Sequence, residues 1–254
     1  VLRVIFSNYF MAMLTPGASG GAVAQVLVLK SYGVPISKGT PIVLIRTVFS
    51  IMFLVIMLPL VFLRDAIEIP YISRDMLLLF AVLAVIATLL GTYILQTKYM
   101  RQFVYNLAQR FKAHKTKDWL SKLETLNQGL GLLYKEPIQS IIVFFESGLS
   151  LLCLYCIAPA LMYAFTPDIP IIDILDRMIL LNLILYFDPT PGGTGIAEGL
   201  FVVLFSAFVP NGTVGIVAVA WRVVAEYLPF FIGMYAVLTL YGRQFVAQET
   251  SREQ

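Results

Sequence analysis

The chain has 254 residues, of which 59% are hydrophobic and 13% charged, and its formal net charge is +3. Soluble domains contain about 45–50% apolar and about 25% charged residues, so this composition excludes a soluble globular protein and a disordered chain. Two cysteines exclude a disulfide scaffold and one histidine excludes a His-rich metal site, so we expect no metal and no other cofactor. The sequence predicts an all-α polytopic membrane protein.

Four stretches are long and apolar enough to span a bilayer as helices, which takes roughly 20 residues. They are residues 41–63, 76–95, 138–162 and 214–240. The chain opens directly in apolar sequence at Val1, and nothing near its start resembles a signal peptide. We therefore expect that it lacks its true N-terminus.

A further apolar region is interrupted by proline and glycine. Residues 174–187 would form a helix of about 21 Å, which is short of a hydrocarbon core of about 30 Å. They run into the Pro/Gly-rich residues 188–195, and a second short apolar run follows at 196–208. Two half-length legs around such an interruption predict a re-entrant hairpin.

The start of the chain has the same order of segments. Residues 1–14 are apolar, residues 15–21 contain proline and glycine, and residues 22–29 are apolar again. This order predicts a second re-entrant hairpin. Alternatively, its first leg is a full spanning helix that the missing N-terminus shortens.

Lysine and arginine in the loops set the orientation, because cytoplasmic loops carry an excess of both. Residues 96–137 hold eight cations against three acids, so we predict that this loop is cytoplasmic. Residues 64–75 and 163–173 then lie outside, while residues 30–40 and the C-terminal tail lie inside. This assignment is consistent only if residues 174–208 enter and leave on the outer side. The prediction is a multi-pass protein of the inner (plasma) membrane.

The basic loop has a pattern of its own. Between Lys98 and Lys122, apolar residues recur at helical spacing with cations on the other face. This pattern suits a helix lying on the anionic lipids of the inner leaflet, or equally a solvated connector. The loop lacks the interleaved aromatic platform of a nucleic-acid site, so we expect no nucleic-acid partner. Assembly into a homo-oligomer is left open.

The pattern Thr-Pro-Gly-x-(Ser/Thr)-Gly occurs twice, at residues 15–20 and 190–195. Each copy precedes a short apolar leg and then a spanning helix that carries an arginine. Arg46 follows the first proline by 30 residues, and Arg222 follows the second by 31. With the predicted orientation, the first unit enters from inside and the second from outside.

These observations predict an inverted-topology repeat within a single membrane domain that covers residues 1–254. Repeat 1 extends over about residues 1–95 and repeat 2 over about residues 138–254, with the basic loop between them. Paired Pro/Gly interruptions in corresponding positions indicate a substrate site near the midplane of a transporter.

The chemistry of such a site favours an anion. Each second leg starts a helix whose first N–H groups lack partners and carry the positive end of the helix dipole. Intramembrane arginines would add bidentate donors for phosphate. The predicted substrate-binding residues are the interruptions and the intramembrane charges, with no catalytic residue among them: Thr15, Pro16, Gly17, Gly20, Gly21, Arg46, Glu146, Pro191, Gly192, Gly193, Thr194, Gly195, Glu198, Arg222 and Glu226.

Structural roles compete with the assignment of the intramembrane charges. Arg46 could snorkel to the inner headgroups. Arg222 and Glu226 are four residues apart and could neutralise each other. Glu146 could pair with either arginine.

Two acids beside the second copy have structural alternatives as well. Glu198 falls in the first turn of its helix, where a carboxylate complements the dipole, so capping competes with catalysis or proton coupling. Asp188 precedes Pro189 and is favoured as a turn residue.

Two groups of residues resemble the flippase-like family, also called the lysylphosphatidylglycerol synthase transmembrane region. The second and more specific group is Thr190-Pro191-Gly192-Gly193-x-Gly195-x-x-Glu198. The resemblance covers nearly the whole chain and implies about two more helices before the first motif. Where the family often has an acid after the first Gly-Gly, this chain has Ala22, which puts an acidic role there in doubt. The first group comprises Leu14-Thr15-Pro16, Gly20-Gly21, Leu29-Lys30-Ser31-Tyr32-Gly33-Val34, Ser37 and Arg46.

The resemblance implies lipid translocation. The family includes the membrane half of the multiple peptide resistance factor, which flips the aminoacyl-phosphatidylglycerol made by a separate soluble domain. We expect a flippase for an anionic or aminoacylated phospholipid or a polyprenyl-phosphate headgroup, and not an enzyme. The alternatives are the membrane part of a phosphatidylglycerol lysyltransferase and a non-transporting envelope scaffold.

Overall fold

The computed structural model describes residues 1–64, 74–95 and 136–250. Within these ranges the chain is helical, and the one β-type feature is an isolated bridge, so the all-α prediction is confirmed. The helices divide into two compact units, one of residues 1–36 with 154–254 and one of residues 37–153. The basic loop lies almost wholly outside the described residues, so its orientation and lipid contacts stay predictions.

Three helical stretches are long and apolar enough to cross a membrane: Ile36–Leu63, Pro137–Tyr163 and Val214–Leu240. They agree with three of the four predicted windows to within a few residues. The fourth window also forms a helix, α4 (Arg74–Leu95), but its apolar stretch as described is the shorter Asp75–Thr88.

The unit of residues 37–153 contains most of α3 (Ile36–Leu63) and α7 (Pro137–Tyr155). The Phe144 ring of α7 packs on α3, with ring centroids 5.9 Å from Phe49 and 6.0 Å from Phe53. Gly148 faces the ring of Phe53 and has no side chain to keep the two helices apart.

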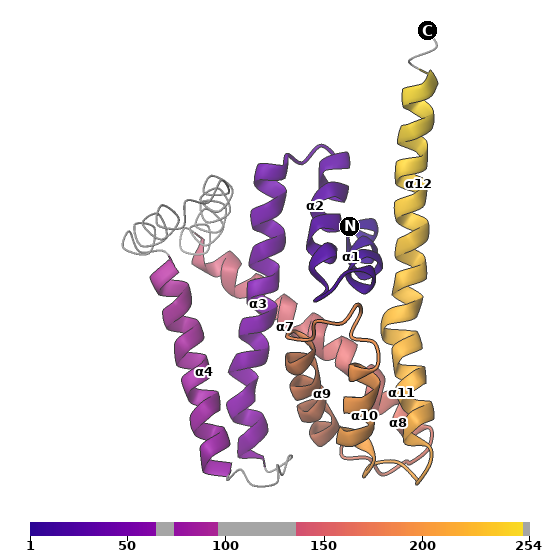
Figure 1. Cartoon of the computed structure of the whole chain (residues 1–254). Coiled ribbons are helices and arrows are strands. Elements are labelled where there is room, and N and C mark those ends of the chain that lie inside the picture. The colour runs from indigo at the N-terminus through magenta and orange to yellow at the C-terminus, as the bar shows by residue number, and fades with distance from the viewer. Residues whose placement is uncertain (65–73, 96–135, 251–254) are drawn as a thin grey trace. The chain divides into compact units, whose positions relative to one another are not determined.

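The other unit holds both Thr-Pro-Gly copies. Helices α1 (Leu2–Leu14) and α2 (Ser19–Ser31) flank the first copy, and α9 (Ile171–Leu185) and α10 (Ile196–Phe205) flank the second. In each pair the second helix packs against the first, so each pair forms a helical hairpin (Figure 1). We call residues 15–18 the first break and residues 186–195 the second break.

A long helical rod follows the second hairpin (Figure 1). It consists of α11 (Val214–Arg222), a π-helical turn η1 (Val223–Tyr227) and α12 (Leu228–Thr250). α11 packs on α10 and on α8 (Ile157–Tyr163), which continues α7 after Cys156. α12 packs instead on α1.

The contact between α1 and α12 depends on Gly233. A Cβ atom at this position would collide with the carbonyl oxygen of Phe6, which belongs to the α1 backbone and cannot rotate away. We therefore expect Gly233→Ala to lower the free energy of unfolding by about 1–3 kcal/mol, as overpacking does.

Thermal unfolding in detergent measures this effect, with Gly199→Ala as the matched control. Gly199 is also helical, but nothing lies within 4 Å of its Cβ position. The control should be neutral or stabilising by up to about 1 kcal/mol, because alanine favours helix over glycine. Equal unfolding midpoints for the two variants would contradict the close approach of α1 and α12.

Candidate functional site

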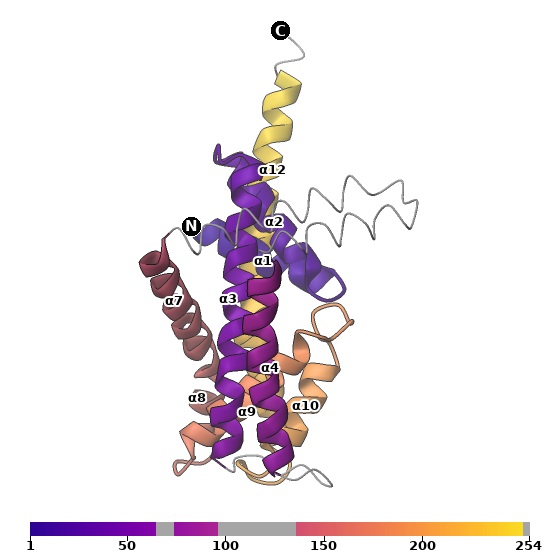
Figure 2. The same ribbon diagram turned by 90° about the vertical axis from the view of Figure 1, so that its left-hand side faces the viewer.

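The two breaks meet each other. Pro16 and Pro191 form an isolated antiparallel bridge. A Cβ atom on Gly192 would lie 3.3 Å from the Cα atom of Met13, so the second break rests against the end of α1. The two break loops lie side by side in both views of the chain (Figures 1 and 2). Segments far apart in sequence thus form one junction.

The two breaks also share a backbone conformation. In each, the hydroxyl at the fifth motif position, Ser19 or Thr194, donates to the carbonyl oxygen of the motif proline, at 3.0 and 2.9 Å. The N–H groups of the same two residues donate to the same oxygens at 3.4 Å. The short sequence pattern therefore encodes one local fold used twice. Two consecutive residues in each copy have positive φ: Gly17 (59°), Ala18 (52°), Gly192 (62°) and Gly193 (67°).

The glycines after the first break pack against α1. The N–H of Gly20 donates to the Thr15 hydroxyl at 2.8 Å, and the N–H of Gly21 donates to the Ala18 carbonyl at 3.1 Å. A Cβ on Gly20 would lie 2.6 Å from the Thr15 side chain, and a Cβ on Gly21 would collide with Asn8. In this structure both amides have acceptors and both glycines serve helix packing.

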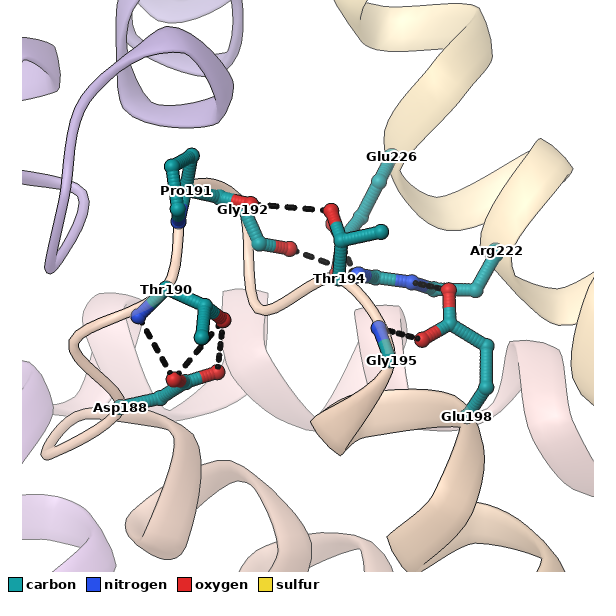
Figure 3. Close-up of polar contacts among 9 residues, drawn as sticks. All are labelled: Asp188, Thr190, Pro191, Gly192, Thr194, Gly195, Glu198, Arg222 and Glu226. Atoms are coloured by element: carbon teal, nitrogen blue, oxygen red, sulfur yellow. Dashed lines mark hydrogen bonds and ion pairs between the residues drawn. The ribbon is translucent and has the colours of Figure 1, made fainter.

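Arg222 is the centre of a polar network at the second break (Figure 3). Its Nε donates to Glu198 Oε1 at 2.8 Å, and its Nη2 donates to the carbonyl oxygen of Gly192 at 2.6 Å. Its Nη1 forms an ion pair with Glu226. All three guanidinium nitrogens are engaged, and the side chain is only 1% exposed.

The acids beside the second break hold its shape. Glu198 Oε2 accepts the N–H of Gly195 at 2.7 Å, so Glu198 caps α10, one of its two predicted roles. The buried Asp188 accepts the N–H and the hydroxyl of Thr190, each at 2.8 Å, so its prediction as a turn residue is confirmed. Figure 3 shows both contacts.

The network carries more negative than positive charge. Three carboxylates, those of Asp188, Glu198 and Glu226, accompany one guanidinium. The side chains of Glu198 and Glu226 are 28% and 24% exposed, whereas that of Arg222 is almost fully covered. The accessible side chains of the network are therefore those of the two glutamates.

Two predicted site residues lie in the other unit. Arg46 on α3 and Glu146 on α7 are exposed, and neither forms an ion pair within the part of the chain that the structure describes. The predicted convergence of Arg46 with Arg222 is therefore untested and stays a prediction.

One structural cation was not predicted. Arg177 Nη1 donates to the carbonyl oxygen of Leu204 at 2.6 Å, and the guanidinium lies 4.6 Å from the ring centre of Phe208. It thus joins the two legs of the second hairpin at the end away from the break. An arginine within a largely apolar leg was the available signal, since such a cation needs a partner.

Replacing Arg222 with methionine should destabilise the protein by about 3 kcal/mol, because it leaves two partly buried carboxylates without their cation. Arg222→Met combined with Glu198→Gln and Glu226→Gln should recover at least half of that loss. Thermal unfolding of the purified variants measures both. If the triple variant is less stable than Arg222→Met alone, the three side chains do not act as one neutralised network.

Comparisons with known proteins identify the family of this chain. Residues 1–233 match the family described as the lysylphosphatidylglycerol synthase TM region. A UPF0104 membrane protein of Archaeoglobus fulgidus is 20% identical over 244 residues, covering 93% of this chain and 74% of that protein. No solved structure matches the chain. Since the family match includes both breaks and the Arg222 network, this chain belongs to the lysylphosphatidylglycerol synthase transmembrane-region family of membrane proteins.

Proposed function

We propose that this chain is a lipid translocase that receives a lipid headgroup beside its two breaks. The observation that carries the proposal is the junction of Pro16 with Pro191. In transporters with inverted repeats, interrupted helices meet near the membrane midplane and form the substrate site. Non-helical backbone at membrane depth is tolerated only where protein or a water-filled cavity covers it. Here the two breaks meet at Pro16 and Pro191, which supports their placement at one level of the membrane as re-entrant hairpins.

The polar network favours one headgroup class among those expected from the sequence. Arg222 is buried and ion-paired with Glu198 and Glu226, and the Gly195 amide at the start of α10 donates to Glu198, so both groups are engaged before a bare phosphate arrives. The partly exposed, acidic side chains of Glu198 and Glu226 suit an ammonium group instead. An aminoacylated phospholipid therefore fits better than an anionic phospholipid or a polyprenyl phosphate.

Reconstitution in vesicles tests the proposal. Fluorescent lysyl-phosphatidylglycerol and phosphatidylglycerol are each placed in both leaflets, and a membrane-impermeant quencher reports which molecules reach the outer leaflet. We expect the protein to move the lysyl lipid from the inner to the outer leaflet, where the quencher reaches it. It should move phosphatidylglycerol in the same direction more slowly. If neither lipid moves, the protein is not a translocase of these lipids. Formation of the lysyl lipid after addition of lysyl-tRNA would favour the lysyltransferase alternative, and lack of both activities would favour a scaffold.

Glu226→Gln tests whether a carboxylate recognises the amine. Glutamine keeps the shape and can still accept from Arg222, but it lacks the charge, and a hydrogen bond to a charged group contributes about 1.5–3 kcal/mol. We expect translocation of the lysyl lipid to slow about tenfold or more, with little change for phosphatidylglycerol. Asp168→Asn, an exposed acid before α9, is the matched control. If Glu226→Gln slowed the translocation of both lipids equally, Glu226 would not be the group that recognises the amine.

A further inference from the structure

The helices of the hairpin-containing unit form two groups. α1, α2 and α12 pack together, and α8, α9, α10 and α11 pack together. Among the described residues, no helix of the first group packs extensively on a helix of the second. The groups are joined by the turn η1 in the rod and by the junction at Pro16 and Pro191, where Gly192 also approaches Met13. Tyr9 of α1 also interacts with Tyr155, which precedes α8.

Each group is anchored to its own end of the rod. Arg222, the last residue of α11, bonds the carbonyl of the second break. Beyond η1, Phe230 lies 5.3 Å from Phe10 of α1 between ring centres, and Gly233 contacts the α1 backbone at Phe6. The first hairpin therefore follows α12, whereas the second follows α11.

The rod is interrupted between these two anchors. Pro229 has no N–H group, so the carbonyl of Ala225 lacks the donor that an α-helix would supply four residues on. The wider π-turn accommodates this, with the N–H of Leu228 donating to the carbonyl of Val223. Prolines and π-turns are the places where helices bend.

We propose that η1 together with Pro229 is a hinge, and that the Pro16–Pro191 junction is a gate that this hinge opens. Bending at the hinge moves α1, α2 and α12 away from α8–α11 while the bonds of Arg222 to Glu198 and Gly192 and the Gly233 contact stay intact. The contact that must break is the proline bridge together with the approaches of Gly192 to Met13 and of Gly17 to the Asp188 carbonyl. The purpose of the gate, passage of a headgroup between the breaks, rests on the proposed function, whereas the hinge itself does not.

A reversible cross-link tests the gate. In a background with Cys153→Ser and Cys156→Ser, the double variant Pro16→Cys/Pro191→Cys places two thiols at the junction. Cβ atoms of antiparallel pairs are about 4.5–5.5 Å apart, which a small shift brings within disulfide reach. Oxidation should reduce translocation of the lysyl lipid at least tenfold, and reduction should restore it. Each single variant is the control. Unchanged translocation by fully cross-linked protein would overturn the gate.

A distance measurement tests the hinge without any transport assay. In the same cysteine-free background, spin labels at Val23 of α2 and Val203 of α10, both exposed, report the separation of the two groups in lipid nanodiscs containing lysyl-phosphatidylglycerol. We expect two distance populations. Pro229→Ala, which supplies the missing N–H, should shift the balance toward the shorter distance.

Pro210→Ala, in the loop before α11, is the matched control and should leave both distance populations unchanged. A single distance population that Pro229→Ala does not alter would overturn the hinge. If the unmodified chain moves no lipid but shows two populations that respond to Pro229→Ala, the proposed function fails and the hinge stands.

Discussion

A buried guanidinium constrains this part of the molecule. Arg222 lies in an apolar helix and is only 1% exposed, so its charge must be compensated by neighbouring groups. That compensation comes from Glu198 on the adjacent helix α10, from Glu226 on the same rod and from the carbonyl of Gly192 in the second break. Because these contacts tie the second break to α11, the break keeps one conformation and presents Pro191 to Pro16.

The proposed position of the breaks within the membrane places a requirement on their backbone groups. A helix interrupted by proline and glycine exposes backbone N–H and carbonyl groups, and exposure of such groups to hydrocarbon is costly. In this chain, side chains and turns take up many of them. Thr15 accepts the amide of Gly20, Glu198 accepts the amide of Gly195, and Asp188 accepts the amide of Thr190.

Local properties of the sequence were enough to predict the helices and the two interruptions. Hydropathy and length identified the rod at 214–240, and the Pro/Gly runs located both breaks to within a few residues. The pairing of Arg222 with Glu198 was not predicted, because 24 residues separate them and hydropathy carries no information on partners. The π-turn was missed as well, since Pro229 lies within an apolar run that reads as one uninterrupted helix.

The contact between the breaks is a tertiary feature of the same kind. The repeated pattern predicted that the breaks are alike. We also expected both breaks to belong to one substrate site with Arg46 and Arg222. The direct bridge between the prolines depends on how both hairpins pack on the rod, through contacts such as Gly233 with Phe6. Such a close approach of two backbones depends on the surface shapes of both helices. The residue type at one position is therefore not enough to predict it.

The central claim is that the two breaks meet inside the membrane. A spin label at Pro16→Cys or at Pro191→Cys, each alone in a cysteine-free background in nanodiscs, reports its depth through the relative accessibility to oxygen and to a water-soluble nickel chelate. We expect both labels at the same depth, near the middle of a hydrocarbon core of about 30 Å. Labels at headgroup level, or at clearly different depths, would contradict the claim.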